Sequence, residues 1–435
     1  MTQDKTETLL TGSKAFPITK EGLEKINEKY NVRPFKEASP SKAQASTIDL
    51  DFIDLSLFKE GDENLAGRQK LAATVEKTLT TYGFLAIENH GIDIEEFEKM
   101  RSIAQSVCEL PEEVQREYLG GAMKSDLEDR SKSLGAERGH GFKPKKYWAM
   151  KNGVEDSIVF YNVRNIVQSI VYDTDESRYP ELVLHYLPEI VHYFRTLHNV
   201  VLKKLTILCD IILELPEGYI WKNYYEVIDG DLYNSGQGFG RMMLYEPMNK
   251  EDEKKVDNHW LRGHSDSGGF TLLTSQPILS LQIRDYFTGE WKFVGHRPGG
   301  LIVNVGDAME FLTGGYFKAA IHRVISPPED QRAFRRLVLI YFSGPKFSSV
   351  LDPDALNSPK LKRLGISKPE EWDTITCGEW DNVKSRLFGK KAVNSAPGDS
   401  PNLVLLYGRL HERWHQAQKD FNLEEAKKTF NIIEV

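Results

Sequence analysis

Seven short apolar runs follow one another closely in the second half of the chain. From about residue 238 onward, Gly, Pro, Asp or Asn separates the runs RMMLY, FTLLTS, LSLQIRD, WKFVGH, GLIVNVGD, AAIHRVIS and RLVLIYFSGP. Short apolar runs bounded by turn residues are typical of strands in an antiparallel sandwich or barrel. This part of the 435-residue chain is therefore predicted to form a mainly β core.

The first half of the chain has a different pattern. The segment STIDLDFIDL, residues 46–55, alternates apolar and acidic residues as a half-buried strand does. Apolar positions at helical spacing then predict helices over about 67–82, 94–118 and 181–214. Helices that precede a β-rich half predict an α+β fold, in which a double-stranded β-helix (a jelly-roll barrel) is buttressed by helices.

These patterns divide the chain into four predicted parts. They are a flexible N-terminal arm (1–45), a helix and strand region (46–215), the jelly-roll core (216–346) and a C-terminal helical extension (347–435). The extension closes with LVLLYGRLHERWHQAQKDF, and residues 402–430 are interpreted as an amphipathic helix.

Composition argues against several classes of function. The formal net charge of −8 offers no basic face for nucleic acid. No stretch approaches the roughly 18 consecutive apolar residues of a membrane span, and the first residues contain no apolar signal core. The 3 cysteines are far apart and odd in number, which argues against a disulfide framework. We therefore expect a cytoplasmic protein that binds neither nucleic acid nor membrane.

Three residues of the β-rich half form a candidate metal site. His264 and Asp266 lie two apart in HSDSGGFTLLTSQ, and residues two apart on an extended strand point the same way. His322 lies several strand-like runs later, so the chain can return it to the pair inside a barrel. Two histidines and one carboxylate suit Fe(II) and leave positions open for O2 and a cosubstrate. Zinc binding and a plain core position for His322 are the alternatives.

An anionic cosubstrate would need a cation in the barrel. Arg336 opens the run RLVLIYFSGP, from which its guanidinium could pair a carboxylate in bidentate fashion. Arg332 and Arg335 compete for this role. Tyr245, in RMMLY, could donate a hydroxyl hydrogen bond to the same carboxylate, with a core position as the alternative.

Taken in order, these motifs resemble the isopenicillin N synthase-like family of 2-oxoglutarate/iron(II)-dependent dioxygenases. The resemblance covers about residues 46–346 and includes YGFLAIENHGI, GHSDSGGFTLLTSQ, GGLIVNVGDAMEFLTGG and RLVLIYFSGP. It implies that His264, Asp266 and His322 bind the iron and that Arg336 binds 2-oxoglutarate. The family usually has Arg-x-Ser here, whereas this chain has Val338 as the third residue, a loss of one hydrogen bond worth about 1 kcal/mol.

The resemblance also implies a reaction. A small organic molecule would be hydroxylated, desaturated or cyclised with O2 and 2-oxoglutarate in specialised metabolism, and succinate and CO2 would be released from the cosubstrate. Two alternatives stay open, a four-electron oxidase that does not use 2-oxoglutarate and a catalytically idle binding protein. The oligomeric state is also left open.

The segment before the core is the candidate wall of the substrate pocket. Residues 140–163, HGFKPKKYWAMKNGVEDSIVFYNV, combine aromatic faces with a few polar groups. A plain core role is the alternative for these side chains. The candidate substrate residues are Trp148, Phe160, Tyr161 and Asn162.

Overall fold

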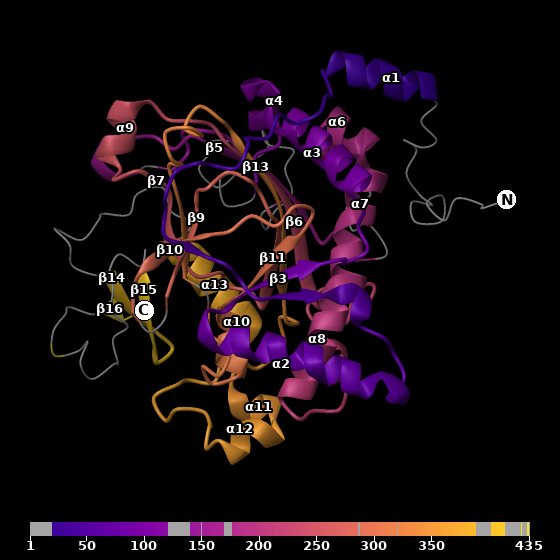
Figure 1. Ribbon diagram of the computed structural model, residues 1–435, viewed down its shortest axis with the longest axis vertical. Coiled ribbons are helices and arrows are strands. Elements are labelled where there is room, and N and C mark those ends of the chain that lie inside the picture. The colour runs from indigo at the N-terminus through magenta and orange to yellow at the C-terminus, as the bar shows by residue number, and fades with distance from the viewer. Residues whose placement is uncertain are drawn as a thin grey trace.

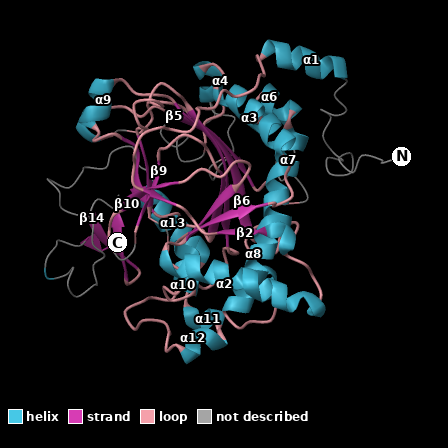
Figure 2. Cartoon of the chain, viewed as in Figure 1, coloured by secondary structure: helices cyan, strands magenta, loops and turns pink. Residues whose placement is uncertain are grey.

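In the described residues, the computed structural model contains two large sheets, a small third sheet near the end of the chain, and a group of helices that covers the largest sheet (Figures 1 and 2). It describes residues 20–120, 140–148, 150–168, 176–285, 288–319, 321–388, 402–413, 428 and 433–434. From β6 to β13 the chain passes from one sheet to the other at nearly every connection, which is the connectivity of a jelly roll. The predicted helix-buttressed jelly roll is confirmed.

The larger sheet carries eight described strands, antiparallel except where β2 pairs with β3. In spatial order they are β2 (Phe52–Asp54), β3 (Phe84–Glu88), β11 (Leu301–Val305), β8 (Phe270–Thr274), β13 (Arg336–Gly344), β6 (Gln237–Tyr245), β5 (Ile158–Arg164) and β4 (Gly141–Lys143).

The smaller sheet carries five described strands, of which β1 and β10 are parallel. Their order is β1 (Thr47–Ile48), β10 (Trp291–Val294), β9 (Leu281–Arg284), β12 (His322–Ile325) and β7 (His259–His264).

Helices cover the outer face of the larger sheet, with α2, α3, α7 and α8 on one side of it in Figure 1. The three predicted helical regions are confirmed, although Pro111 separates α3 from α4 and a π-helical segment joins α7 to α8. None of the described helices is long and apolar enough to cross a bilayer. The helices are α1 (Lys20–Lys29), α2 (Leu65–Thr81), α3 (Ile94–Cys108), α4 (Glu112–Glu117), α6 (Glu181–His185), α7 (Leu187–Thr196), α8 (Lys203–Ile212), α9 (Lys250–Lys255), α10 (Asp307–Leu312), α11 (Pro353–Leu356), α12 (Pro359–Arg363) and α13 (Cys377–Phe388).

The larger sheet is buried on both faces, which explains why its strands are apolar almost throughout. Successive strand residues point to opposite faces. On β13, Leu337, Leu339 and Tyr341 belong to the core shared with the helices. Val338 and Ile340 belong to a second core inside the barrel. Polar residues on the inner face therefore stand out against apolar neighbours.

The end of the chain differs from the predicted helix. Residues 402–413 form a hairpin of β14 (Asn402–Leu406) and β15 (Arg409–Arg413), and β16 (Ile433–Glu434) pairs with β14. Tyr407 and Gly408 make the two-residue turn with φ of 50° and 74°, the backbone of a type I′ turn. A Cβ at Gly408 would lie 1.6 Å from the Glu371 carbonyl oxygen, so only glycine fits there. Residues 414–427, 429 and 430 of the predicted helix lie outside the described residues.

The described part of the predicted N-terminal arm, residues 20–45, is packed on the protein. Ile26 of α1 and Phe35 are buried against the main core. Lys29 and Tyr30 both donate hydrogen bonds to the Glu181 carboxylate of α6. The polar composition of residues 20–29 is explained by their position, because α1 lies on the surface and contacts the core along one apolar edge.

The close approach of β6 to α7 yields a stability test. A Cβ on Gly240 would lie 2.4 Å from Cε2 of Phe194, whose ring is fully buried and cannot move aside. We expect Gly240→Ala to lower the free energy of unfolding by about 1–3 kcal/mol, as overpacking does. Chemical denaturation measures this change.

Gly67 provides the matched control. It is exposed on α2, and a Cβ there would meet nothing within 4 Å. Gly67→Ala should raise the free energy of unfolding by up to about 1 kcal/mol through helix propensity. Equal effects of the two substitutions would contradict the packing that we describe between β6 and α7.

Candidate metal and cosubstrate site

The two histidines of the predicted triad lie on neighbouring strands. In the antiparallel pair β7–β12, His264 is directly opposite His322, and the ring centroids are 4.3 Å apart. Asp266 follows two residues after the end of β7, with Oδ1 3.8 Å from Nε2 of His264. One ligand atom from each of the three residues lies within 4.8 Å of the other two. The structure thus brings together the three residues that the sequence singled out.

Hydrogen bonds orient two of these side chains. The Arg262 carbonyl accepts a 2.8 Å hydrogen bond from Nδ1 of His264, which leaves Nε2 directed at the other two residues. Oδ2 of Asp266 accepts hydrogen bonds from Thr271 Oγ1 (2.7 Å) and Asn304 Nδ2 (2.8 Å). Oδ1 therefore faces the histidines. Such outer contacts fix the geometry of metal ligands in proteins.

Protonation states at neutral pH also suit a metal. Burial, and then the proximity of His322, holds the pKa of His264 well below its ordinary value. Burial alone would raise the pKa of Asp266, but the two histidines and the hydrogen bonds from Asn304 and Thr271 outweigh it and hold the pKa below its ordinary value. A neutral imidazole and an ionised carboxylate are the forms that bind a divalent cation. The donor set therefore fits Fe(II).

The three residues lie on the wall of a cavity of about 270 Å³ inside the barrel. A concave, mainly apolar site with a few polar groups is what a small molecule requires. The apolar lining comprises Phe84, Trp148, Met150, Met243, Trp260, Leu261, Leu273, Leu281, Val324, Ile340 and Phe342.

Arg336 and Tyr245 face each other across the β13–β6 pair and both line this cavity. The guanidinium carbon of Arg336 lies 4.8 Å from the centre of the Tyr245 ring. Arg336 is only 4% exposed, and no carboxylate of the described residues lies within ion-pair distance of its guanidinium. Burial lowers the pKa of Arg336. Because the ordinary pKa of an arginine is very high, the guanidinium still carries its charge at neutral pH.

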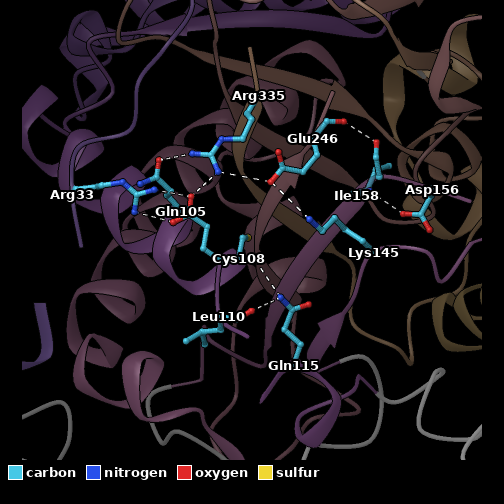
Figure 3. Close-up of polar contacts among 12 residues, drawn as sticks. Arg33, Gln105, Cys108, Leu110, Gln115, Lys145, Asp156, Ile158, Glu246 and Arg335 are labelled. Atoms are coloured by element: carbon cyan, nitrogen blue, oxygen red, sulfur yellow. Dashed lines mark hydrogen bonds and ion pairs between the residues drawn. The ribbon is translucent and has the colours of Figure 1, made fainter. Parts of the chain in front are cut away.

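The two competing arginines point elsewhere. Arg335 pairs with Glu109 at 2.6 Å and lies in the polar cluster of Figure 3, together with Gln105 and Glu246. Arg332 lies 3.5 Å from Glu253. Neither of them lines the cavity. Val338 is fully buried opposite Met243, in the apolar core of the barrel.

Of the four candidate substrate residues, only Trp148 lines the cavity. Phe160 and Asn162 point to the same face of β5 but lie behind Arg241 of β6. Tyr161 points to the opposite face, where its hydroxyl is 3.2 Å from Nε2 of His140. Tyr161 therefore does not line this cavity, and the prediction that it does is wrong. Side chains alternate between the two faces along a strand, so Tyr161 faces the core shared with the helices.

Sequence reasoning missed several polar residues of the cavity wall. Arg241 precedes Tyr245 by an even number of residues on one strand, and this parity could have placed it on the inner face. No comparable signal existed for Lys384 and His411. They enter the cavity wall from α13 and β15, in the C-terminal extension.

Comparisons with known proteins support one enzyme family for this chain. The model of the 2OG-Fe(II) oxygenase superfamily matches residues 238–345, and that of the non-haem dioxygenase in morphine synthesis N-terminal region matches residues 50–157. The 1-aminocyclopropane-1-carboxylate oxidase of Dictyostelium discoideum is 26% identical over 367 residues, which is 79% of this chain and 94% of that protein.

Solved structures show the same fold. A full-length Neurospora crassa protein in complex with alpha-KG has a TM-score of 0.60 and 16% identity, over 80% of this chain and 99% of that chain. The rice dioxygenase for auxin oxidation has a TM-score of 0.54 and 17% identity, over 79% of this chain and 97% of that chain. With both halves of its core matched in order by the family models, the chain belongs to the 2OG-Fe(II) oxygenase superfamily, the Fe(II)- and 2-oxoglutarate-dependent dioxygenases.

Proposed function

We propose that this dioxygenase oxidises a small organic molecule in the cavity, with His264, Asp266 and His322 as the ligands of Fe(II). The observation that carries the proposal is the position of the triad and the buried Arg336–Tyr245 pair on the walls of one cavity. When bound, Fe(II) and 2-oxoglutarate supply the electrons that activate O2 for attack on a C–H bond, with release of succinate and CO2. Hydroxylation, desaturation and cyclisation are the outcomes that such a site can give.

Arg336 and Tyr245 are proposed to hold the carboxylate of 2-oxoglutarate that is remote from the metal. A buried guanidinium without an acidic partner is costly, and a carboxylate would satisfy it in bidentate geometry. Burial raises the pKa of Tyr245, so its hydroxyl remains a hydrogen-bond donor at neutral pH. Val338 offers no hydroxyl, so Tyr245 is the proposed hydroxyl donor to this carboxylate.

The chain's apolar walls are proposed to hold the substrate against the metal and to exclude water. Trp148 and Trp260 contribute flat apolar faces to the cavity. Relatives named for the oxidation of small molecules, such as the D. discoideum 1-aminocyclopropane-1-carboxylate oxidase, support a role in specialised metabolism.

Lys384 is proposed to position the ligand segment. Its side chain is 8% exposed, and Nζ donates to the Ser265 carbonyl (2.8 Å) and hydroxyl (3.2 Å), between the two ligands of that segment. Nζ also pairs with the Asp307 carboxylate, and the Asp307 backbone N–H donates to the Asp266 carbonyl at 2.8 Å. Helix α13 thereby fastens the segment that carries His264 and Asp266.

The first prediction concerns the metal ligands. Anaerobic addition of 2-oxoglutarate to the Fe(II)-loaded protein should give a charge-transfer band at roughly 500 nm, as expected for a chelate on open metal positions. His264→Ala or Asp266→Ala should weaken metal binding at least about 100-fold and remove the band.

His259→Ala is the matched control, because His259 lies at the other end of β7 and does not line the cavity. It should keep the band. A band that survives His264→Ala would refute the ligand assignment. Iron binding without a band in the unmodified protein would favour the four-electron oxidase, and failure to bind iron would favour the idle binding protein.

The second prediction concerns the cosubstrate. Arg336→Gln removes the buried cation, and we expect the Kd for 2-oxoglutarate to rise about 100-fold or more while the Kd for Fe(II) changes little. Arg332→Gln, in which the altered residue lies outside the cavity, should leave both constants unchanged. Titration of the charge-transfer band measures them. The reverse pattern between the two variants would move the cosubstrate site to Arg332.

The third prediction concerns Lys384. The double variant Lys384→Met/Asp307→Asn removes the buried pair without leaving a lone charge, and should weaken Fe(II) binding about 10- to 100-fold through a looser ligand segment. Lys368→Met is the control, because Lys368 also donates to a backbone carbonyl in the extension, that of Trp372, and does not line the cavity. If the double variant and Lys368→Met lose the same thermal stability and bind Fe(II) with the same affinity, Lys384 only supports the fold.

A further inference from the structure

A second arginine, Arg241, lines the same cavity at a different position along the β6–β13 pair. Arg241 is on β6 opposite Ile340, whereas Arg336 is opposite Tyr245. Nε of Arg241 donates to Asn162 Oδ1 at 2.8 Å, and the guanidinium lies 3.9 Å from the centre of the Phe160 ring. The Phe342 ring lies on another side, at 4.9 Å. The guanidinium is thus held in one position by a hydrogen bond to one amide and by contacts with two aromatic rings.

No carboxylate of the described residues pairs with this cation at ion-pair distance, and its two terminal nitrogens have no hydrogen-bond partner among them. Burial lowers the pKa of Arg241 to about 10, so the charge is still present at neutral pH. The acids that line the cavity are already engaged. Asp156 pairs with Lys143, and Asp266 belongs to the proposed metal triad.

The charges of the proposed cosubstrate complex leave Arg241 unmatched. Fe(II), Asp266, the 2-oxoglutarate dianion and Arg336 together sum to zero. Arg241, which is half-buried, adds a further positive charge on the wall of a mainly apolar cavity, where an unpaired charge is costly. Arg241 is opposite Ile340, which lies four residues after Arg336 on β13. At about 3.3 Å per residue, the backbone positions of the two arginines are therefore about 13 Å apart along the strand direction. Two different anions therefore suit the two arginines better than one.

We propose that Arg241 binds the substrate, and that the substrate is an organic carboxylate with a flat apolar body; this rests on the proposed function of the same site. The planar guanidinium matches a carboxylate in bidentate geometry. Trp148, Met243 and Phe342 line the cavity with apolar surface that suits the body of such a molecule. The Arg241 contacts to Asn162 and Phe160 fix the direction from which the carboxylate is received.

The test compares acids with their neutral amides. Protein loaded with Zn(II), which is diamagnetic, and saturated with 2-oxoglutarate is titrated with phenylacetate, benzoate and hexanoate and with the three matching amides, and binding is followed by ligand-observed NMR. We expect at least one acid to bind about tenfold or more tightly than its amide. Arg241→Gln should abolish that preference and change the Kd for 2-oxoglutarate less than about threefold. Arg241→Lys, which keeps the charge, should retain part of the preference.

Several outcomes would overturn the proposal. They are equal binding of acid and amide, a preference that persists in Arg241→Gln, and no binding of any acid at about 10 mM. A loss of 2-oxoglutarate binding in folded Arg241→Gln, with Arg336→Gln unaffected, would assign Arg241 to the cosubstrate instead. Failure of the unmodified protein to bind 2-oxoglutarate would reject the proposed function rather than the role of Arg241. Thermal unfolding of both Arg241 variants shows whether they fold, and the acid-to-amide ratio in the unmodified protein and in Arg241→Lys tests the proposal independently of Arg241→Gln.

Discussion

The register between β7 and β12 is the constraint on which the site depends. Because His264 is paired directly with His322, a slip of one residue in either strand would turn one imidazole to the other face of the sheet. The next turn then has to bring Asp266 back toward both rings. Hydrogen bonds from Thr271 of β8 and Asn304 of β11 do this from the other sheet. The metal site therefore exists only where the two sheets of the jelly roll are correctly stacked.

Burial of the larger sheet on both faces sets the remaining chemistry. The outward side chains of β13 and β6 pack under the helices, while the inward ones enclose the cavity. Arg336, Tyr245 and Arg241 are polar exceptions on an apolar inner face. Each of them carries a desolvation cost that apolar residues would avoid. The proposed ligands, the carboxylate of 2-oxoglutarate at Arg336 and Tyr245 and the substrate carboxylate at Arg241, would restore the interactions that these side chains lose on burial.

Local pattern predicted the β core, the three helical regions and the residues of the triad, because strand and helix periodicity and the His-x-Asp spacing are properties of short segments. Aromatic content alone does not distinguish the two faces of residues 158–164: Tyr161 follows Phe160 directly and therefore faces the outer core. The hairpin turn at Tyr407–Gly408 gave no usual turn signal, since Tyr rarely adopts positive φ. Contacts of Lys384 and His411 with the cavity depend on tertiary packing of the extension, which no local pattern encodes.

Burial differs along the inner face, and this places one of the two proposed anion sites deeper in the cavity than the other. Arg336 and Tyr245 are buried at one end of the β13–β6 pair, whereas Phe342 and Phe239, at the other end, are half-buried. Arg241 lies between these two ends, beside the triad residue Asp266 on the cavity wall. On the proposed assignments, 2-oxoglutarate occupies the deeper position and the substrate carboxylate the one nearer the half-buried end. A substrate held at Arg241 would then cover the cosubstrate, so that the apolar body of the substrate, together with Lys384 and His411 from the C-terminal extension, completes the closure of the site.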